Sequence, residues 1–433
     1  MERTVPTEFN CPCGREHRSD LKETVIGIGV IARLPELIKK YGGTKPFIYD
    51  DVNTRSAAGE RVRELLGDMK YSAHTFKDAH LLPDNSAVGS ALMHFDKSCD
   101  MVIAVGSGVI GDISKIIANI ANVPMITVAT APSMDGFASA TSSMCLDGLK
   151  ISLPSKVPVA ILADTDIIKE APERMLASGV GDMVAKYISL CEWKISHILN
   201  GEYYCEDIAK IMRSALDKVA ANAVGLAKRD PEAVAAVTEG LILAGQAMSW
   251  AGVSRPASGI EHYISHVWDM RAEEFGTPSD FHGIQCGVGT LISLRLYEHI
   301  RTLKPSLEKA TEHAAAFDRE AHFELLRRLF GKGAETMISA EAKDKKYDVS
   351  EHARRIKRII VHWDEICAVM DEMLPTYEYV EKLLRTVKAP TTAEGLGLKD
   401  TVGLALEASK DIRYKYIASH LLWDLGEEIP EIK

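Results

Sequence analysis

The chain has 433 residues, which is enough for two or three domains, and its hydrophobic fraction of 46% and charged fraction of 26% are typical of a soluble globular protein. A formal net charge of −10 argues against a nucleic-acid partner, because such a partner needs a concentrated basic face. We also expect no membrane span. The most apolar stretch, residues 101–132, is interrupted by Asp112, Lys115 and Asn119 and falls short of the roughly 20 apolar residues required.

The first 21 residues are polar and mixed in charge, and we expect them to form an N-terminal tail. They lack the apolar core of a signal peptide, and the eight cysteines of the chain show no regular spacing, as free thiols in a reducing compartment do. Both features predict a cytoplasmic protein. Within this stretch Cys11, Cys13 and His17 form a C-x-C…H pattern, which we interpret as a surface turn or tail, with metal chelation as the alternative.

Residues 22–170 alternate short apolar runs with helical stretches, and we expect them to form an α/β nucleotide-binding domain. Continuous apolar runs with helices between them are typical of a mainly parallel sheet that is covered on both faces. The first predicted strand ends at Asp50 and Asp51. The predicted strands span residues 45–49, 101–105, 125–128 and 157–162.

A G-x-G-x-x-G pattern formed by Gly106, Gly108 and Gly111 follows the second of these strands. Glycines let the backbone approach a pyrophosphate, and the free N–H groups at a helix start face its negative charge. We therefore predict a phosphate-binding turn before a helix over residues 112–122. A tight turn without a ligand is the alternative.

The ordinary dinucleotide fingerprint has an acidic residue about 20 positions after the glycines. That region, residues 129–131, contains no acid, whereas Asp50 and Asp51 lie upstream. The pattern therefore indicates a strand order other than the standard Rossmann order. The segment from Thr130 to Ser139 follows the next strand, and its hydroxyl groups and Asp135 are suited to contact a ribose, a nicotinamide or a substrate. Asp135-Gly136 as a plain turn is the alternative.

From residue 171 onward Ala, Leu, Glu, Lys and Met dominate stretches with helical periodicity, so we expect a helical domain over residues 171–433. The boundary is placed near residues 169–174, where Pro172 follows a strand and loop. A cleft between the two domains is the expected place for a site. Long helices are predicted at 208–228, 231–250 and 306–328, and residues 330–433 are helical in pattern without recognisable chemistry.

Two histidines and one carboxylate in the helical region are candidate metal ligands. The spacing of Ser258 and Glu261 is that of a capping box, so a helix is expected to start there, with His262 and His266 on one face. His282 precedes a glycine-containing helix, and Asp182 is expected to open another helix, with Lys186 one turn on. Such a set suits a catalytic divalent metal with open positions. Hydrogen-bonded core histidines and a carboxylate that complements a helix dipole are the alternatives.

Five segments occur in the same order in a known family: VGSGVIGDISK, TAPSMDGFAS, GVGDMVAKY, SRPASGIEHYISH and HGIQCGVGT. Together they resemble the sn-glycerol-1-phosphate dehydrogenase family, especially its bacterial arabinose-operon branch. This family is part of the dehydroquinate synthase-like and iron-containing alcohol dehydrogenase superfamily. The resemblance implies an N-terminal α/β domain that holds NAD(P) and a C-terminal helical domain that holds the metal and the substrate.

Residue by residue, the resemblance implies Asp182, His262 and His282 as the metal ligands. Asp182, Asp135 and His266 match catalytic positions, and His266 is our candidate proton relay because imidazole titrates near neutral pH. Related synthases carry an arginine seven residues before the first histidine ligand, where Arg255 stands. The implied cofactor contacts are Asp51, Gly106, Gly108, Gly111, Asp112, Thr130, Ser133 and Ser139, and the implied substrate contacts are Asp135, Asp182, Lys186, Arg255 and His266.

The implied reaction is the reduction of dihydroxyacetone phosphate to sn-glycerol 1-phosphate by NADH or NADPH, with one divalent metal that polarises the carbonyl. Zinc, nickel and iron all suit the ligands. Asp51 beside the ribose favours NAD. The expected partners are a small phosphorylated polyol or ketose and a second copy of the chain, in a homodimer or higher homo-oligomer. A carbocycle synthase that uses NAD transiently, a non-phosphorylated polyol dehydrogenase and an inactive nucleotide-binding protein are the alternatives.

Overall fold

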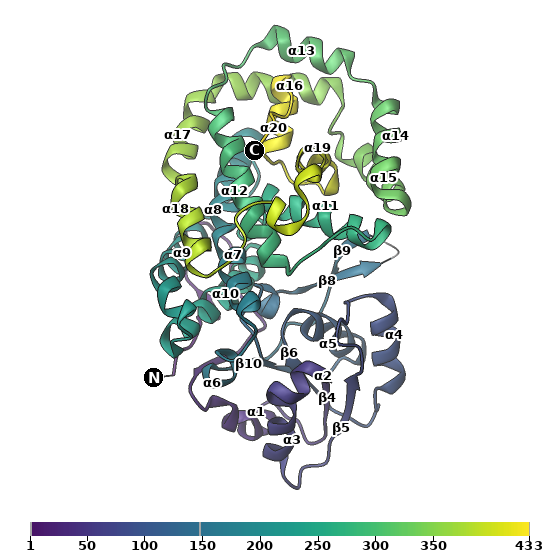
Figure 1. The fold of residues 1–433 in the computed structure, drawn as a ribbon, viewed down its shortest axis with the longest axis vertical. Helices are drawn as coiled ribbons and strands as arrows, with labels where there is room; N and C mark the ends of the chain where they lie inside the picture. Colours follow the sequence, from purple (N-terminus) through teal and green to yellow (C-terminus); the bar gives the residue numbers. More distant parts are fainter. Residues whose placement is uncertain (1, 147–148, 433) are drawn as a thin grey trace.

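The computed structural model describes residues 2–146 and 149–432, and it divides into an α/β part and a helical part, lower and upper in Figure 1. The α/β part contains a six-stranded sheet in which every neighbouring pair of strands is parallel. Its order, β3-β10-β7-β6-β4-β5, places the first strand beside the last, so the expected departure from the standard Rossmann order is confirmed. The strands are β3 (Glu23–Gly27), β4 (Pro46–Asp51), β5 (Ser72–Phe76), β6 (Met101–Gly106), β7 (Met125–Ala129) and β10 (Ala160–Asp164).

Helices cover both faces of this sheet, as the continuous apolar runs predict. On one face Ile48 and Ile103 pack with residues of α1 (Leu34–Lys40) and α3 (Glu60–Leu66). On the other face Phe47 and Tyr49 pack with α4 (Asn85–His94) and α5 (Gly108–Ala121). Three of the four predicted strands lie within one or two residues of β4, β6 and β7, whereas β10 begins three residues later than predicted. The sequence did not predict two strands of the sheet, β3 and β5. It also did not predict the antiparallel hairpin that β8 (Thr141–Leu146) forms with β9 (Leu149–Pro154).

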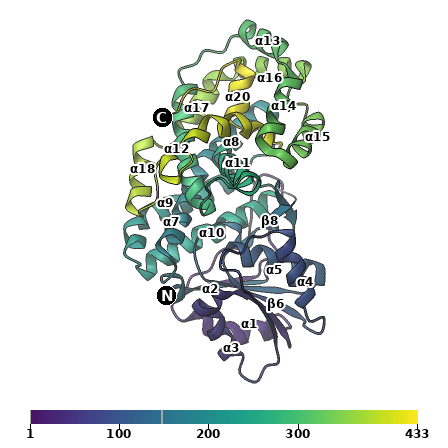
Figure 2. The same cartoon turned by 45° about the vertical axis from the view of Figure 1, so that its right-hand side comes forward.

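The helical part begins after a short helix, α6 (Thr165–Ile168), and wraps around the central helix α8, as the two views in Figures 1 and 2 show. Its helices are α7 (Glu173–Val184), α8 (Lys186–Asn200), α9 (Glu206–Ala227), α10 (Pro231–Ala251), α11 (Ile260–Phe275), α12 (His282–Ile300), α13 (Leu307–Ala316), α14 (Arg319–Phe330), α15 (Ala334–Asp344), α16 (Val349–Val361), α17 (Trp363–Met373), α18 (Tyr377–Thr386), α19 (Val402–Ile412) and α20 (Ala418–Leu425).

The helices predicted at 208–228 and 231–250 are confirmed as α9 and α10. The single helix predicted at 306–328 is wrong, because the chain forms α13 and α14 with a break between them. Phe317 adopts an extended conformation, and the carboxylate of Asp318 accepts a hydrogen bond from the N–H of Ala321. An aspartate in this position caps a new helix rather than continuing the old one.

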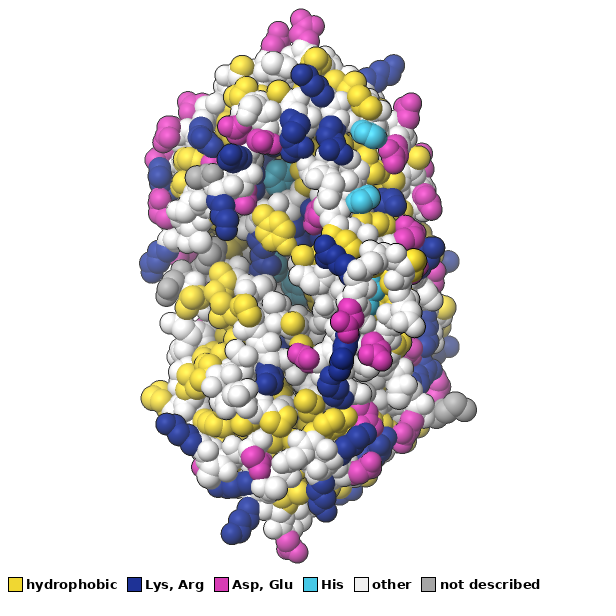
Figure 3. All heavy atoms as spheres, turned by 180° about the vertical axis from the view of Figure 1, so that it is seen from behind, with side chains coloured by type: hydrophobic (Ala, Val, Ile, Leu, Met, Phe, Trp, Pro, Cys, Tyr) yellow, Lys and Arg dark blue, Asp and Glu magenta, His cyan; other side chains and the backbone are white. Residues whose placement is uncertain are grey.

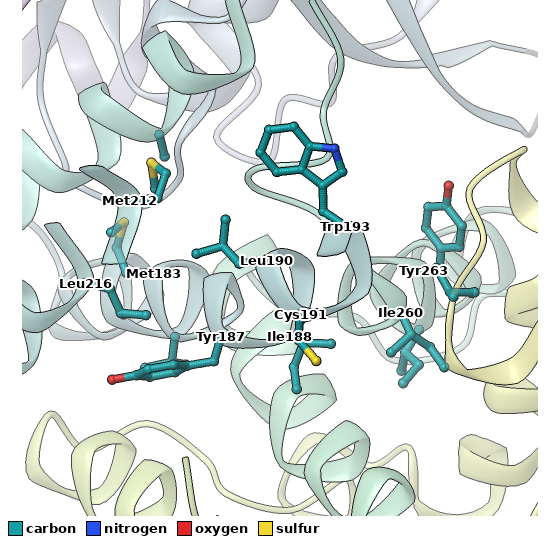
Figure 4. Packing of buried hydrophobic residues seen from close by; sticks show 14 of the residues in the cluster. Met183, Tyr187, Ile188, Leu190, Cys191, Trp193, Met212, Leu216, Ile260 and Tyr263 are labelled. Atoms are coloured by element: carbon teal, nitrogen blue, oxygen red, sulfur yellow. The ribbon is translucent and has the colours of Figure 1, made fainter. Parts of the chain in front are cut away.

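The core of the helical part lies around α8, whose side chains are almost all buried. Figure 4 shows Leu190 and Trp193 on one side of α8 and Tyr187 and Cys191 on the other, with Leu216 and Tyr263 on neighbouring helices. A helix that is apolar on most sides is buried on most sides. The helix α8 packs against α7, α9 and α11, and two of these helices, α7 and α11, carry residues of the candidate site.

The N-terminal segment is attached to the helical part. A short antiparallel pair, β1 (Glu8–Phe9) and β2 (His17–Arg18), lies against α10. There the indole N–H of Trp250 donates to the carbonyl oxygen of Thr7, over 3.2 Å.

None of the described helices is long and apolar enough to cross a membrane. Figure 3 shows basic and acidic side chains interspersed over one face of the molecule.

Candidate metal and nucleotide site

The glycine turn lies at the carboxyl end of β6, in the middle of the sheet. Here β6 ends at Gly106, Ser107 is the N-cap residue, and α5 begins at Gly108, four residues earlier than predicted. A Cβ atom on Gly106 would lie 2.6 Å from Cβ of Ile110, so the tight turn requires glycine. A Cβ atom on Gly111 would meet open space. The first turn of α5 thus presents a smooth backbone surface and free N–H groups, which suits a pyrophosphate.

The segment after β7 is bonded to the glycine turn. The N–H of Thr130 donates to the carbonyl oxygen of Gly106 over 3.2 Å, and the hydroxyl groups of Ser107 and Ser133 lie 2.6 Å apart. Ser139 is buried and its Oγ lies 3.0 Å from Oγ1 of Thr141. Thr130 and Ser133 therefore lie beside the turn, whereas Ser139 contacts Thr141 at the start of β8.

A buried lysine that the sequence analysis did not single out also supports this segment. Lys115, on α5, donates to the carbonyl oxygens of Gly136 and Thr141 and lies 2.9 Å from the carboxylate of Asp112. Asp112 is thus held in the second turn of α5, at the rim of a small pocket that Gly108 and Gly111 also line. The only sequence signal for Lys115 is a cation at i+3 from Asp112 in an otherwise apolar helix.

The acid at the end of the neighbouring strand is Asp51. Because β4 pairs with β6 in parallel, their carboxyl ends lie side by side. Asp51 Oδ1 accepts hydrogen bonds from the N–H groups of Asn53 and Thr54 at the start of a short helix, α2 (Val52–Thr54). Asp50, the other acid at this strand end, is buried and paired with Arg63 at 2.6 Å. Of the two, Asp51 is the one that the structure leaves partly exposed beside the glycine turn.

Two of the predicted ligands, Asp182 and His282, each lie beside the third, His262, in the helical part. The carboxylate of Asp182 lies 3.5 Å from Nε2 of His262, and the rings of His262 and His282 are 4.9 Å apart between centroids. Asp182 lies in the last turn of α7, so the expectation that it opens a helix is wrong. It therefore does not complement a helix N-terminus, and that alternative is excluded for this residue.

The carboxylate of Glu261, which the sequence pattern assigns only to a capping box, orients His262. Its Nδ1 lies 2.8 Å from Oε1 of Glu261, and the same oxygen accepts the N–H of Gly259. The predicted capping box is wrong in detail, because α11 begins at Ile260 and Gly259 is its N-cap residue, without a side-chain cap. A carboxylate on Nδ1 directs the lone pair of Nε2 toward Asp182, as in many histidine-metal sites.

His282 is the first residue of α12, as predicted, and its Nδ1 lies 3.3 Å from Oγ of Ser265. A buried thiol that we did not predict, Cys286, lies one turn on, with Sγ 3.5 Å from Nε2 of His282. Burial disfavours the thiolate, yet His262 and His282 lower the pKa of Cys286. Cys286 is therefore a polarisable group beside the predicted ligands.

Asp135 and Lys186 connect this cluster to the segment after β7. The N–H of Asp135 donates to Oδ2 of Asp182 over 2.9 Å, and the ammonium group of Lys186 lies 2.6 Å from the carboxylates of both residues. Asp135 is two residues after Ser133, which is bonded to the glycine turn. A single short segment thus joins the predicted nucleotide turn to the predicted metal cluster.

The electrostatics of the cluster favour a cation. Burial opposes ionisation of Asp182, but Lys186 and the two histidines hold the pKa of this carboxyl well below its usual range. Burial also opposes protonation of His262, yet Cys286, Asp182 and Glu261 raise its pKa well above the usual value. The pKa of His282 is raised as well, against burial, by Cys286 and by Asp182. An ionised Asp182 beside two imidazoles that bind protons strongly forms a set of donors that also suits a metal ion.

His266 lies on the same side of α11, with its ring 5.8 Å from that of His282. Burial, and after it the positive charges of Arg413 and the neighbouring histidines, lower the pKa of His266 well below 6.5. The expectation that this imidazole titrates near neutral pH is therefore wrong. Its Nδ1 is buried and has no hydrogen-bond partner among the described residues.

Arg255 lies away from this cluster. Its guanidinium group donates to the carboxylate of Glu202 from Nε and from Nη2, the latter over 2.7 Å, and to the carbonyl oxygen of Tyr416 from Nη1. It lines a separate cavity with residues of α16. The structure therefore does not bring Arg255 to the predicted substrate position.

Glycines in two of the sequence motifs set the distance between α7 and α12. A Cβ atom on Gly181 would lie 2.1 Å from the carbonyl oxygen of Gly283, and one on Gly283 would lie 2.0 Å from that of Ser178. A Cβ atom on Gly179 would lie 2.0 Å from the carbonyl oxygen of Pro132. The backbones are thus in direct contact, and this contact brings the end of α7 and the start of α12 to the same place.

Comparisons with known proteins agree with this architecture. A family model described as iron-containing alcohol dehydrogenase matches residues 25–172. Glycerol-1-phosphate dehydrogenase (NAD(P)+) of Halalkalibacterium halodurans is 35% identical over 67% of this chain and 74% of the relative. The enzyme of the same name from Pyrococcus horikoshii is 34% identical over 70% of this chain and 88% of the relative.

The crystal structure of glycerol dehydrogenase from Schizosaccharomyces pombe superimposes with a TM-score of 0.62, covering 97% of this chain and 91% of that chain, at 18% identity. At this identity the likeness concerns the fold. It confirms the expected combination of an α/β part that contains a parallel sheet with a helical part.

Proposed function

The chain belongs to the glycerol-1-phosphate dehydrogenase family, among the iron-containing alcohol dehydrogenases, and from this premise we propose that it reduces dihydroxyacetone phosphate to sn-glycerol 1-phosphate with NADH or NADPH. In this reaction the ketone accepts a hydride from the nicotinamide and a proton at its oxygen. The observation that carries the proposal is the segment from Ser133 to Asp135, which touches the glycine turn at one end and Asp182 at the other.

The donor set fits a catalytic divalent metal. Asp182, His262 and His282 supply one carboxylate and two imidazoles, and Glu261 holds the first imidazole in the required orientation. Three protein ligands leave coordination positions open, as is typical of catalytic rather than structural sites. A cation bound there would polarise a substrate carbonyl as a Lewis acid. Zinc, nickel and iron all remain candidates for these ligands.

The nucleotide is proposed to lie across the carboxyl ends of β4, β6 and β7. The first turn of α5 would face the pyrophosphate, and Asp51 would accept from the adenosine ribose, which favours NAD over NADP. Thr130, Ser133 and Ser139 would line the nicotinamide end. In this arrangement the hydride donor would lie beside Asp135 and the proposed metal ligands.

We assign the proton relay to His266 and propose that Asp135 and Lys186 orient the substrate. Because burial and nearby cations keep His266 neutral, it would pass a proton by accepting one at one nitrogen and donating from the other. Lys186 bridges Asp135 and Asp182, so it compensates the two carboxylates and fixes their positions.

For the substrate phosphate the geometry favours Lys150 and Arg413 over the predicted Arg255. Both cations lie close enough to His266 to lower its pKa. Lys150 comes from β9 and lies 3.9 Å from Asp269, whereas Arg413 follows α19 and donates to Ser152 on β9. The Nη2 atom of Arg413 is buried and has no hydrogen-bond partner among the described residues. Because a buried unpaired donor is costly, this guanidinium group is suited to bind an anion.

The decisive experiment is an assay of the purified chain loaded in turn with zinc, nickel or iron. We expect net oxidation of NADH or NADPH with dihydroxyacetone phosphate and much less with dihydroxyacetone. No net loss of reduced cofactor would refute the dehydrogenase and leave the carbocycle synthase as the alternative. An equal rate on dihydroxyacetone would identify a polyol dehydrogenase and would remove the phosphate site.

The phosphate assignment has its own test in Arg413→Gln. Because a charge-assisted hydrogen bond contributes about 1.5–3 kcal/mol, the KM for dihydroxyacetone phosphate should rise about 10–100-fold with an unchanged KM for NADH. Arg354→Gln, which removes an exposed arginine paired with Glu351, is the matched control. An unchanged KM for dihydroxyacetone phosphate in Arg413→Gln would refute this assignment.

A further inference from the structure

The turn between β1 and β2 gathers three potential metal ligands outside the site described above. The strands pair with Phe9 opposite His17, so the residues between them return on themselves and bring Cys11 and Cys13 close to the histidine. Sγ of Cys13 lies 3.1 Å from Nε2 of His17. The C-x-C…H pattern therefore forms a compact cluster in space.

A fourth ligand comes from a distant part of the chain. Cys205, the N-cap residue of α9, is fully buried, and its Sγ lies 3.5 Å from Sγ of Cys11 and 3.6 Å from Nε2 of His17. All four donor atoms lie within 4.8 Å of one another. Three sulfurs and one imidazole nitrogen thus surround one point between the N-terminal segment and the helical part.

These separations fit a tetrahedral zinc ion. With Zn–S bonds of about 2.3 Å and Zn–N bonds of about 2.0–2.1 Å, the donor atoms of a tetrahedral site lie roughly 3.5–3.8 Å apart. The distances of 3.5 and 3.6 Å from Cys205 fall in this range, and the distance of 3.1 Å between Cys13 and His17 is a few tenths of an ångström shorter. Small side-chain rotations are enough to admit the ion.

The histidine presents the nitrogen that a metal requires. Nδ1 of His17 lies 3.1 Å from the carbonyl oxygen of Trp250, so the proton of the neutral ring is on Nδ1 and Nε2 carries the free lone pair. The ring is also fixed by stacking on Phe9, with centroids 4.7 Å apart. A backbone carbonyl on the far nitrogen is the usual support of a metal-binding histidine.

Trp193, a buried residue of α8, holds the loop that precedes Cys205. The indole N–H of Trp193 donates to the carbonyl oxygen of Tyr203 over 2.5 Å, and Figure 4 shows this indole extending away from α8. The hydroxyl of Tyr203 lies 3.4 Å from Sγ of Cys13. Tyr203 therefore links the anchored loop to the cysteines of the N-terminal turn.

We propose that Cys11, Cys13, His17 and Cys205 hold a structural zinc ion that fastens the N-terminal segment to the helical part. Four protein ligands close the coordination sphere, which distinguishes this ion from the open site at Asp182. Both ends of this link are tied to helices, because Cys205 is the N-cap residue of α9 and His17 is bonded to the end of α10. The proposal is independent of the dehydrogenase activity.

Metal content is the first test, measured on the full-length chain by elemental analysis after dialysis. The wild type is expected to retain a thiolate-bound zinc ion in addition to the metal at the dehydrogenase site. Cys13→Ser, at an exposed position, should lose one equivalent per chain, and Cys367→Ser, a thiol on α17, should lose none. A zinc content of Cys13→Ser equal to that of the wild type would overturn the proposal.

Cobalt substitution identifies the ligands directly. Because Cys286 lies beside His282, the spectra are recorded in a His282→Ala background, which removes a predicted ligand of the other site. Intense thiolate-to-cobalt charge-transfer absorption is expected in this background. It should disappear when Cys13→Ser or Cys11→Ser is added, and it should persist with Cys286→Ser. Charge-transfer bands that depend on Cys286 instead would contradict the assignment.

Peptide mapping of alkylated protein separates zinc binding from a disulfide. We expect Cys11 and Cys205 to be reduced in the purified protein and protected from alkylation until a chelator is added. The chelator should also lower the melting temperature of the wild type but not that of Cys13→Ser. A disulfide between Cys11 and Cys205, or rapid alkylation of both without chelator, would exclude the zinc ion.

Discussion

In the α/β part the candidate nucleotide site is made mainly of backbone at the ends of neighbouring strands, whereas in the helical part the candidate metal site is made of side chains from three helices. The glycine turn needs only β6, Ser107 and the first turn of α5, which are contiguous in the chain. The metal cluster needs α7, α11 and α12, whose ligands are 100 residues apart between Asp182 and His282.

This difference explains how each region responds to substitution. A backbone site depends on the conformation of one turn, so its local requirements are glycines and caps. A site built from several helices depends on every contact that sets their separation, including glycines that face other helices rather than a ligand. The four predictions below test this difference, starting with the change expected to have the largest effect.

Asp182→Asn should abolish the site in the helical part. The amide removes the negative charge that faces His262 and Lys186, so we expect loss of the bound catalytic metal and a fall in kcat of about a thousandfold or more. Elemental analysis and steady-state kinetics check this. Asp166→Asn, an exposed residue paired with Lys169, is the control. A variant that keeps both metal and normal rate would show that Asp182 is not a ligand.

Gly181→Ala should disturb the same site without touching a ligand. Its new methyl group would lie 2.1 Å from the carbonyl oxygen of Gly283 and force α7 away from α12, at a cost of about 1–3 kcal/mol in the free energy of unfolding. The affinity for the metal should also fall, because the ligands on α7 and α12 would move apart. Gly403→Ala, in α19 where a Cβ atom meets nothing within 4 Å, should be neutral or stabilising in thermal unfolding. Equal effects of the two substitutions would refute the role of the glycine contact.

Glu261→Gln should weaken metal binding while the cluster stays in place. The carboxylate orients His262 through Nδ1, and loss of such a partner lowers metal affinity by about 10–100-fold. Competition with a chelator measures this affinity, and Glu298→Gln, at a partly exposed residue on α12 that pairs with Arg295, serves as the control. If both variants bind metal as tightly as the wild type, Glu261 has only the structural role at Gly259.

Asp51→Asn tests the α/β part and should have the smallest effect. The amide oxygen still caps α2, but the charge that would repel a 2′-phosphate is gone, so the preference for NADH over NADPH should fall by roughly tenfold. The ratio of kcat/KM for the two cofactors reports this change. Metal content should be unaffected, which distinguishes the two parts of the molecule. An unchanged ratio would place the ribose elsewhere.

Most of the architecture of the α/β part was predictable from the sequence. Apolar runs at residues 45–49, 101–105 and 125–128 indicated buried parallel strands, and the missing acid after Gly111 indicated an unusual strand order. These patterns are local, because a strand buried on both faces has to be apolar along its whole length. Membership of the family was also indicated by the order of the motifs and is confirmed by the relatives. The domain boundaries, the ligand roles and the oligomeric state stay predictions.

What the sequence determined, then, is the type of each element and the chemistry that each motif carries. Only the tertiary structure decided that Asp182 lies beside His262, that Arg255 binds Glu202, and that Cys205 joins the C-x-C…H segment. The reason is physical. Propensity and capping act within a few residues, whereas contacts between residues 53 to 194 positions apart depend on how whole helices pack against one another.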